Sequence, residues 1–125
     1  MNNIEGINNF LDDKENNHLL INQVSEEIGI FYLYVIQHFS NSLGININWN
    51  ADTDNISTNT DLFGLKKINV FNATSSKKID QILLSNDKSI VITDYKNFKK
   101  YQKNYQTING YNFSSDLNIF LKKIL

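Results

Sequence analysis

The spacing of apolar and polar residues changes along this chain, and it predicts helices in the first part. Apolar side chains recur at helical spacing over residues 3–11, which predicts a short helix or an ordered arm there. From His18 onward they recur every three or four positions as far as Leu43. This spacing predicts one long, largely buried helix that ends near Gly44, since glycine commonly stops helices. The β-branched and aromatic residues at 30–36 are also compatible with a strand, although the period of the whole window favours a helix.

The rest of the chain alternates between short apolar runs and amphipathic segments. We predict strands at residues 45–49, 67–72, 89–93 and 105–109, with a polar loop over 50–60. Three helices are predicted among them: one capped by Ser75 or Ser76, one at 95–103, and a last one capped by Ser114 or Ser115. The apolar residues that the last helix should direct inward are Leu117, Ile119 or Phe120, Leu121 and Ile124. This alternation predicts an α/β fold in which helices flank a small, mainly parallel sheet, with the long helix N-terminal to it.

Length and composition are those of one folded domain. The chain has 125 residues, 41% of them hydrophobic, so we assign 1–125 to a single domain, with 1–17 as a possible N-terminal arm. Cysteine is absent from the sequence, which excludes disulfides and thiolate metal sites. Polar residues interrupt each apolar run before it reaches the length of a membrane span, and the acidic, Asn-rich start differs from a signal peptide. We therefore expect a cytoplasmic protein without a membrane partner.

Charge is distributed unevenly between the two halves of the chain. Residues 1–62 contain nine acidic residues and one lysine, whereas residues 63–125 contain eleven lysines and four aspartates. A basic half can form a face for nucleic acid or for an acidic partner. Alternatively, the two halves attract each other within one domain, although exposed ion pairs contribute little stability. Asn, Lys and Ile are abundant and Arg and Pro are absent, which is typical of an AT-rich coding sequence from a low-GC bacterium or a phage.

The sequence lacks the common signatures of nucleotide, metal and catalytic sites. Its five glycines are isolated and none is followed by lysine, which excludes the usual phosphate-binding loop. Residues 52–57 begin like a calcium loop, but Ser57 and Phe63 stand where such a loop needs glycine and glutamate. Asp94 follows a predicted strand, where α/β folds often place functional groups, so an enzyme that uses Asp94 is the alternative with least support. We expect Asp94 instead to cap the next helix. Because no nucleophile and base have a spacing typical of catalysis either, we predict no enzymatic activity, no cofactor and no metal.

Four lysines in the segment 95–103 share the spacing of one helical face, and aromatic residues run beside them. The lysines are Lys96, Lys99, Lys100 and Lys103, and the aromatic residues are Tyr95, Phe98, Tyr101 and Tyr105. Lysines interleaved with aromatic rings can follow a phosphate backbone and stack on bases. The four lysines and Tyr101 are therefore a candidate nucleic-acid interface, which would suit a small phage or mobile-element protein. The alternative is an ordinary helix whose solvent-facing side is rich in lysine.

A Leu-Phe pair lies in the polar stretch before the predicted strand at 67–72. The sequence Asn59-Thr60-Asp61-Leu62-Phe63 resembles the short linear motif Gln-Leu-(Ser/Asp)-Leu-Phe, by which bacterial proteins bind the replication sliding clamp. Asp61, Leu62 and Phe63 match the motif, whereas Asn59 replaces glutamine and Thr60 replaces leucine. Two adjacent large apolar side chains can enter pockets on a partner while the acid and the amide fix the approach. The alternative is that the pair folds into the core of this domain.

The run from Asp61 to Leu125 resembles the N-terminal domain of the bacterial clamp-loader delta subunit. In that family an exposed Leu-Phe precedes a basic pair and a strand, as in residues 61–71 here, and a polar turn, a helix and a buried strand follow. A basic region comes next, and a helix of Asp-Leu-x-x-Phe-Leu type comes last, here at 116–121. The resemblance implies an AAA+-like domain without ATPase activity that engages the sliding clamp. It also implies a strand and a degenerate phosphate turn before the long helix, whereas the pattern of residues 1–17 predicts no strand.

Overall fold

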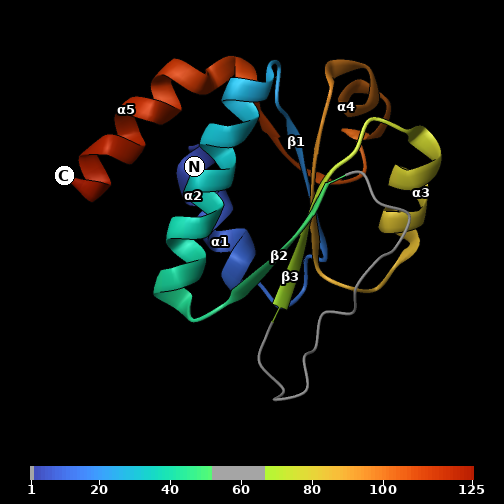
Figure 1. Ribbon diagram of the computed structural model, residues 1–125, viewed down its shortest axis with the longest axis horizontal. Helices are drawn as coiled ribbons and strands as arrows, with labels where there is room; N and C mark the ends of the chain where they lie inside the picture. Colours follow the sequence, from blue (N-terminus) through green and yellow to red (C-terminus); the bar gives the residue numbers. More distant parts are fainter. Residues whose placement is uncertain (1, 52–66) are drawn as a thin grey trace.

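Helices and strands alternate along most of the described chain (Figure 1). A computed structural model describes residues 2–51 and 67–125. Its helices are α1 (Asn3–Asp12), α2 (Glu26–Leu43), α3 (Ser76–Leu84), α4 (Tyr95–Tyr101) and α5 (Phe113–Ile124). Its strands are β1 (His18–Asn22), β2 (Asn46–Ala51), β3 (Lys67–Asn72), β4 (Ser89–Thr93) and β5 (Gln106–Asn109). A short 3-10 turn at Gly110–Asn112 leads into α5.

The described strands form one sheet in the order β2-β3-β4-β1-β5, and each neighbouring pair is parallel. All five residues of β4 are buried, as are four of the five residues of β1. Continuous apolar runs of this kind are expected where helices cover both faces of a parallel sheet. The predicted α/β fold with helices flanking a parallel sheet is therefore confirmed.

The helices form two layers, one on each face of the sheet, and each layer encloses a core. α1, α2 and α5 cover one face, and α3 and α4 cover the other (Figure 1). Within β1, Leu19 and Ile21 join the core beneath α1, α2 and α5, whereas Leu20 joins the core beneath α3 and α4. One strand supplies both cores because successive side chains of a strand point to opposite faces.

Side chains and a glycine fix the ends of several helices. Ser25, Ser75 and Asp94 accept a hydrogen bond from a first-turn N–H group of α2, α3 and α4, respectively. These bonds satisfy donors that have no partner within the helix. Gly44 ends α2 in the left-handed conformation, with φ of 70°. The predicted caps at Ser75 and Asp94 and the predicted stop near Gly44 are confirmed, as are the predicted limits of β3 and β4.

The prediction of one helix from His18 to Leu43 is wrong in its first part. Residues 18–22 form β1, which pairs with β4 on one side and with β5 on the other. The strand conformation is favoured because it places Leu19 and Ile21 in one core and Leu20 in the other, with all three fully buried. α2 begins after the turn at 23–25, so the sheet has a strand before its long helix. The N-terminal segment forms α1, as predicted, and buries Ile4, Ile7, Phe10 and Leu11 in the core.

The last helix begins earlier than predicted and faces a different way. α5 starts at Phe113, directly after the 3-10 turn, and neither Ser114 nor Ser115 caps it. Its buried positions are Asp116 and Phe120, whereas Leu121 and Ile124 are 37% and 44% exposed. The hydroxyl of Tyr32 in α2 donates a hydrogen bond of 2.5 Å to Asp116, which turns that side of α5 toward the core. The prediction that Leu121 and Ile124 point inward is therefore wrong.

The sheet separates an acidic layer from a basic layer. α1 and α2 carry four acidic residues and no lysine, namely Glu5, Asp12, Glu26 and Glu27. α3 and α4 carry five lysines and one acid, namely Lys77, Lys78, Lys96, Lys99, Lys100 and Asp80. α5, which lies in the layer of α1 and α2, adds Lys122 and Lys123 in its last turn. The charge asymmetry of the sequence is therefore retained as two faces of opposite sign.

Candidate functional site

The candidate clamp-binding residues Asp61, Leu62 and Phe63 lie outside the described residues. The described chain ends β2 at Ala51 and resumes at Lys67, the first residue of β3. The three residues therefore belong to the connection between two neighbouring parallel strands at one side of the sheet. Their exposure stays a prediction of the sequence.

The lysines of the candidate nucleic-acid interface are exposed and close together. Lys96, Lys99 and Lys100 belong to α4, and Lys103 lies in the turn that follows it. The three helical lysines line a surface depression of about 510 Å³ together with Ser76, Tyr95 and Asn97. The depression lies where α4 meets the first turn of α3, so part of the predicted basic face forms a hollow between two helices.

Tyr101 is tied to α3 rather than turned toward solvent. Its hydroxyl contacts the carboxylate of Asp80 and lies 3.3 Å from the carbonyl oxygen of Ser76, and its ring packs against the α3–α4 core. Partial burial, together with the Asp80 carboxylate, raises the pKa of Tyr101 to about 12. The more accessible ring beside these lysines is Tyr95, which is 48% exposed and contacts Tyr111 edge-to-face. Tyr111 comes from the 3-10 turn, so its proximity depends on the fold and not on helical spacing.

The turn between β1 and α2 lies at the carboxyl ends of the strands. The connection that follows β1 runs to the edge strand β2, whereas the connection that follows β4 runs in the other direction, to β5. The two connections therefore diverge between β1 and β4, which are neighbours in the sheet. In α/β sheets such a point is the usual place for a ligand. The Asn22 side chain holds the turn, because it accepts a hydrogen bond from the N–H of Val24 and donates one to Asn109. Val24 has φ of 65°, a left-handed conformation that β-branched residues rarely adopt.

This turn is unsuited to a phosphate group. The first turn of α2 contains Glu26 and Glu27, whose charges repel an anion from the helix N-terminus. The side chain of Gln23 lies against Gly29, so closely that a Cβ on Gly29 would be 2.5 Å from the Gln23 amide oxygen. Gln23 therefore occupies space beside α2 that a bound group would need. The strand, turn and helix are present at this site, but the chemistry for holding a nucleotide phosphate is not.

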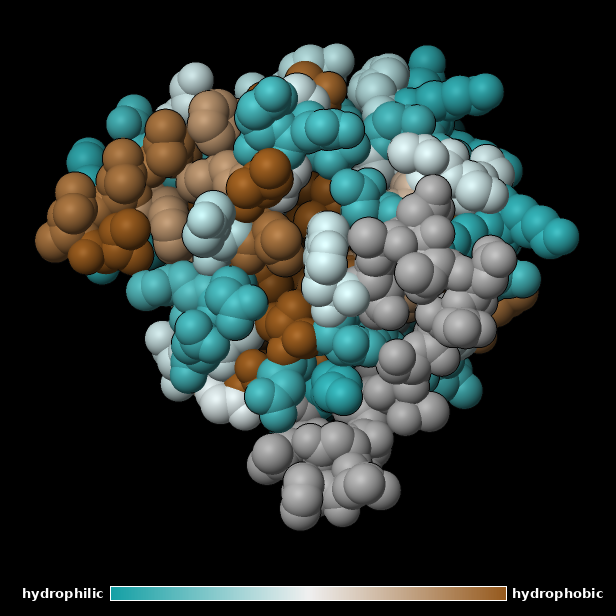
Figure 2. Space-filling model, in the orientation of Figure 1, coloured by the Kyte–Doolittle hydropathy of each residue, from teal (hydrophilic) through white to brown (hydrophobic). Residues whose placement is uncertain are grey.

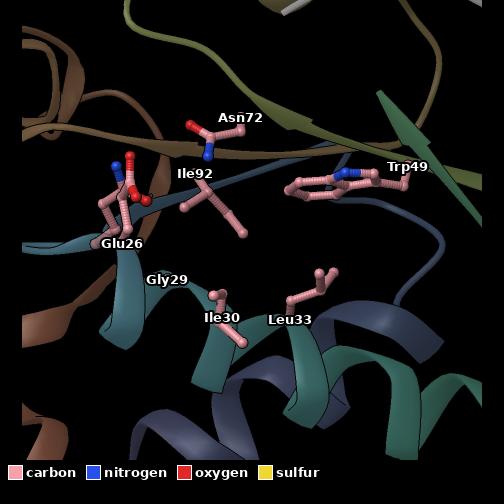
Figure 3. A pocket seen from close by; sticks show the side chains of 8 residues that line it. Glu26, Gly29, Ile30, Leu33, Trp49, Asn72 and Ile92 are labelled. Atoms are coloured by element: carbon pink, nitrogen blue, oxygen red, sulfur yellow. The ribbon is translucent and has the colours of Figure 1, made fainter. Parts of the chain in front are cut away.

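An apolar pocket lies beside this turn, between α2 and the sheet. Its volume is about 160 Å³, and Figure 3 shows Ile30 and Leu33 of α2 facing Ile92 of β4, with Trp49 of β2 at one end. Glu26 and Asn72 supply polar groups away from Trp49, and Gln23 also lines the pocket. A volume of this kind accommodates a side chain of a partner rather than a cofactor, since ligand pockets usually have at least about 300 Å³.

The pocket continues into a second hollow along the outer side of α2. Ile30 and Leu33 line both, and Tyr34 and Gln37 complete the second hollow. Ile30 is 54% and Tyr34 is 68% exposed, and Trp49 is also exposed. Figure 2 shows hydrophobic surface gathered between α2 and the strand beside it. We call the surface formed by Ile30, Leu33, Tyr34 and Trp49 the α2–β2 groove.

One perturbed group lies in the core and lines none of the pockets described above. Tyr32 donates its hydrogen bond to the buried Asp116, which also accepts one of 2.9 Å from the side chain of Asn3. Burial, assisted by the Asp116 carboxylate, raises the pKa of Tyr32 far above its usual range. The three residues come from α2, α5 and α1, so this network joins the three helices of one layer. Its position in the core indicates a structural contribution.

Comparisons with known proteins do not assign the chain to a family. No family model matches it, and no curated protein matches it significantly. Within residues 2–51 and 67–125, no three His, Asp or Glu side chains are grouped as metal ligands. Over the same residues, none of the helices has the length and apolar character needed to cross a membrane. The features of this chain that point to a function are therefore its surfaces and the motif in the β2–β3 connection.

Proposed function

We propose that this chain is a non-enzymatic protein-binding module of DNA replication that docks on a bacterial sliding clamp through Asp61, Leu62 and Phe63. The observation that carries the proposal is the Asp-Leu-Phe sequence in a polar connection directly before a buried strand. Clamp binding would place the protein in the cytoplasm, where replication takes place in bacteria.

The arrangement before the long helix supports the proposal. The resemblance to the clamp-loader delta domain implies a strand and a degenerate phosphate turn before that helix. β1, the turn at 23–25 and α2 occur in this order, and the first turn of α2 carries Glu26 and Glu27 where an anion would have to bind. A domain of this kind can keep an α/β framework while having lost nucleotide chemistry, which suits a binding function rather than an ATPase.

The free energy of binding to the clamp is expected to come mainly from a short apolar anchor. Two adjacent large apolar side chains can fill neighbouring pockets on a partner, and such anchors carry most of the energy of an interface. The connection between β2 and β3 joins two strands that the sheet holds in fixed register. Its two ends are therefore fixed, which lowers the entropy cost of presenting the motif.

Replacing both Leu62 and Phe63 with alanine is expected to weaken binding to purified bacterial sliding clamp by at least about 30-fold, because even one such anchor is worth about 2 kcal/mol or more. The measurement is isothermal titration calorimetry or biolayer interferometry. The matched control replaces Leu84 and Tyr111, an exposed leucine and an exposed aromatic residue on other elements, and should keep the original affinity. Unchanged affinity after the Leu62→Ala and Phe63→Ala changes would contradict the proposal.

A second candidate function is nucleic-acid binding through α4. The specific observation is that Lys96, Lys99 and Lys100 converge on one depression beside the exposed ring of Tyr95. Lysines grouped in this way can contact successive phosphates, while an exposed tyrosine can stack on a base. The candidate interface is therefore the α4 lysines with Tyr95, and Lys103 extends it beyond the helix.

For this candidate, Lys99→Glu combined with Lys100→Glu is expected to abolish retention on single-stranded DNA or RNA at low salt. The unmodified protein should show affinity that falls steeply with salt, because bound phosphates release counterions. Lys122→Glu combined with Lys123→Glu makes the same change of charge on α5, in the other layer, and should leave retention intact. Absence of retention at low salt, or equal loss in both variants, rejects nucleic-acid binding through α4.

A further inference from the structure

Two partly exposed apolar surfaces of this chain complement each other in charge. The first is the α2–β2 groove, formed by Ile30, Leu33, Tyr34 and Trp49. The second is a stripe on α5, formed by Leu117, Leu121 and Ile124, whose spacing of four and three residues places them on one side of the helix. Figure 2 shows hydrophobic surface over the free end of α5 and hydrophobic surface between α2 and the sheet. Ile30, Tyr34 and Trp49 of the groove and Leu121 and Ile124 of the stripe are exposed, whereas Leu33 packs against the core and Leu117 is half-buried.

Acidic residues flank the groove and basic residues flank the stripe. Glu26 lines the pocket between α2 and the sheet, at the end away from Trp49, and Glu27 is exposed beside it at the start of α2. Lys122 and Lys123 are exposed in the last turn of α5 and lie between Leu121 and Ile124 in the sequence, so they project to either side of the stripe. A helix that brings apolar anchors together with two positive charges matches a groove that ends in two negative charges.

The two surfaces of one molecule lie on different sides of α2. α5 packs against α2 through Phe31 and His38, which contact Phe113 and Phe120. The groove lies on the side of α2 that faces Trp49 and β2. The α5 stripe of one molecule is therefore placed to meet the groove of another molecule rather than its own.

We propose that the α2–β2 groove is the docking site for the α5 stripe of a second copy of this chain. The formal net charge of −1 lets two copies approach without strong overall repulsion. Because the groove and the stripe are different surfaces, the contact is head-to-tail, and two copies close on each other only if both contacts form at once. Apolar burial supplies the affinity and the two pairs of opposite charges set the orientation.

The test is sedimentation equilibrium of the full chain over about a hundredfold range of concentration at low salt. The average mass of the unmodified protein is expected to rise with concentration. Glu26→Lys with Glu27→Lys, and separately Lys122→Glu with Lys123→Glu, should each weaken association at least about tenfold. Mixing these two variants should restore association, because the reversed groove of one then fits the reversed stripe of the other.

A variant that leaves the charge unchanged controls for effects of the charge reversals on the fold. Ile30→Ser with Tyr34→Ser removes exposed apolar surface of the groove and should also give a monomer, while circular dichroism confirms that each variant is folded. A wild-type protein that stays monomeric at every concentration overturns the proposal. So does a mixture of the two charge variants that fails to associate while the wild type does. No clamp is present in these experiments, so their outcome is independent of the proposed clamp binding.

Discussion

Replacing Gly110 with alanine is expected to lower the free energy of unfolding by about 3 kcal/mol. Gly110 begins the 3-10 turn between β5 and α5 and lies against the turn that follows β1. A Cβ at this position would overlap the carbonyl oxygen of Asn22 and lie 3.2 Å from that of Gln23. The overlapped oxygen belongs to the end of β1, which the sheet holds between β4 and β5. Relief would therefore require backbone movement at the centre of the fold.

Urea denaturation of the two proteins measures this difference, and Gly6→Ala is the matched control. Gly6 lies inside α1, where an added Cβ would meet Ile108 at 3.5 Å, an ordinary contact distance. Alanine favours a helix over glycine by up to about 1 kcal/mol, so Gly6→Ala should leave stability unchanged or raise it. If Gly110→Ala unfolds at the same urea concentration as the unmodified protein, the close approach of this turn to β1 is wrong.

Replacing Tyr32 with phenylalanine is expected to cost about 2 kcal/mol, the usual contribution of a hydrogen bond to a charged group. The change removes the hydroxyl that donates to Asp116 and leaves a carboxylate that is 2% exposed with Asn3 as its remaining partner in the network. The same residue pair sets the orientation of α5, so the loss should also loosen that helix. Hydrogen exchange of the α5 amides measures the second effect.

Ionisation of Tyr32 is also expected to lower the stability of the folded protein at alkaline pH. Burial and the Asp116 carboxylate raise the pKa of Tyr32 in the folded protein, so the folded state disfavours ionisation. The stabilisation is complete below about pH 10, the pKa of an unfolded tyrosine, and it is lost as the pH rises above that value. Tyr32→Phe should therefore show a smaller loss of stability above pH 10 than the unmodified protein. Tyr34→Phe, at a position that is 68% exposed, should behave like the unmodified protein at every pH.

The sequence predicts β3, β4 and the caps at Ser75 and Asp94 because the signals there are local. β4 is a run of apolar residues between a polar turn and a capping aspartate, and β3 is a short β-branched run. Ser75 and Asp94 precede their helices directly and accept hydrogen bonds from the first turn, as cap residues do. Each of these features depends on residues within a few positions of one another, so it can be recognised without the fold.

The spacing of apolar residues does not separate β1 from α2, because the apolar residues of β1 continue into the helical spacing of α2. Leu19, Leu20 and Ile21 are followed by Val24 and Ile28 with no glycine or proline between them. The boundary was marked by Ser25 followed by Glu26 and Glu27, a typical helix start, and this signal would have divided the segment. Pairing with β4 and β5, which are far away in the sequence, decides in favour of a strand.

The candidate surfaces depend even more on tertiary contacts. Apolar residues occupy two sides of α5, and the hydrogen bond from Tyr32 to Asp116 decides which side is buried. The spacing of the α4 lysines was predictable, but the inward position of Tyr101 follows from its contact with Asp80 on α3. The α2–β2 groove combines a helix with an edge strand, so no single segment of the sequence contains its signal.

A titration of isotopically labelled protein with purified bacterial sliding clamp, followed by NMR, tests the central proposal most directly. The proposal predicts that the amide signals of Asp61, Leu62 and Phe63 shift or lose intensity first, at substoichiometric clamp, while those of α4 stay unchanged. Signals that do not respond at saturating clamp, or changes confined to α3 and α4, would contradict docking through the Leu-Phe pair.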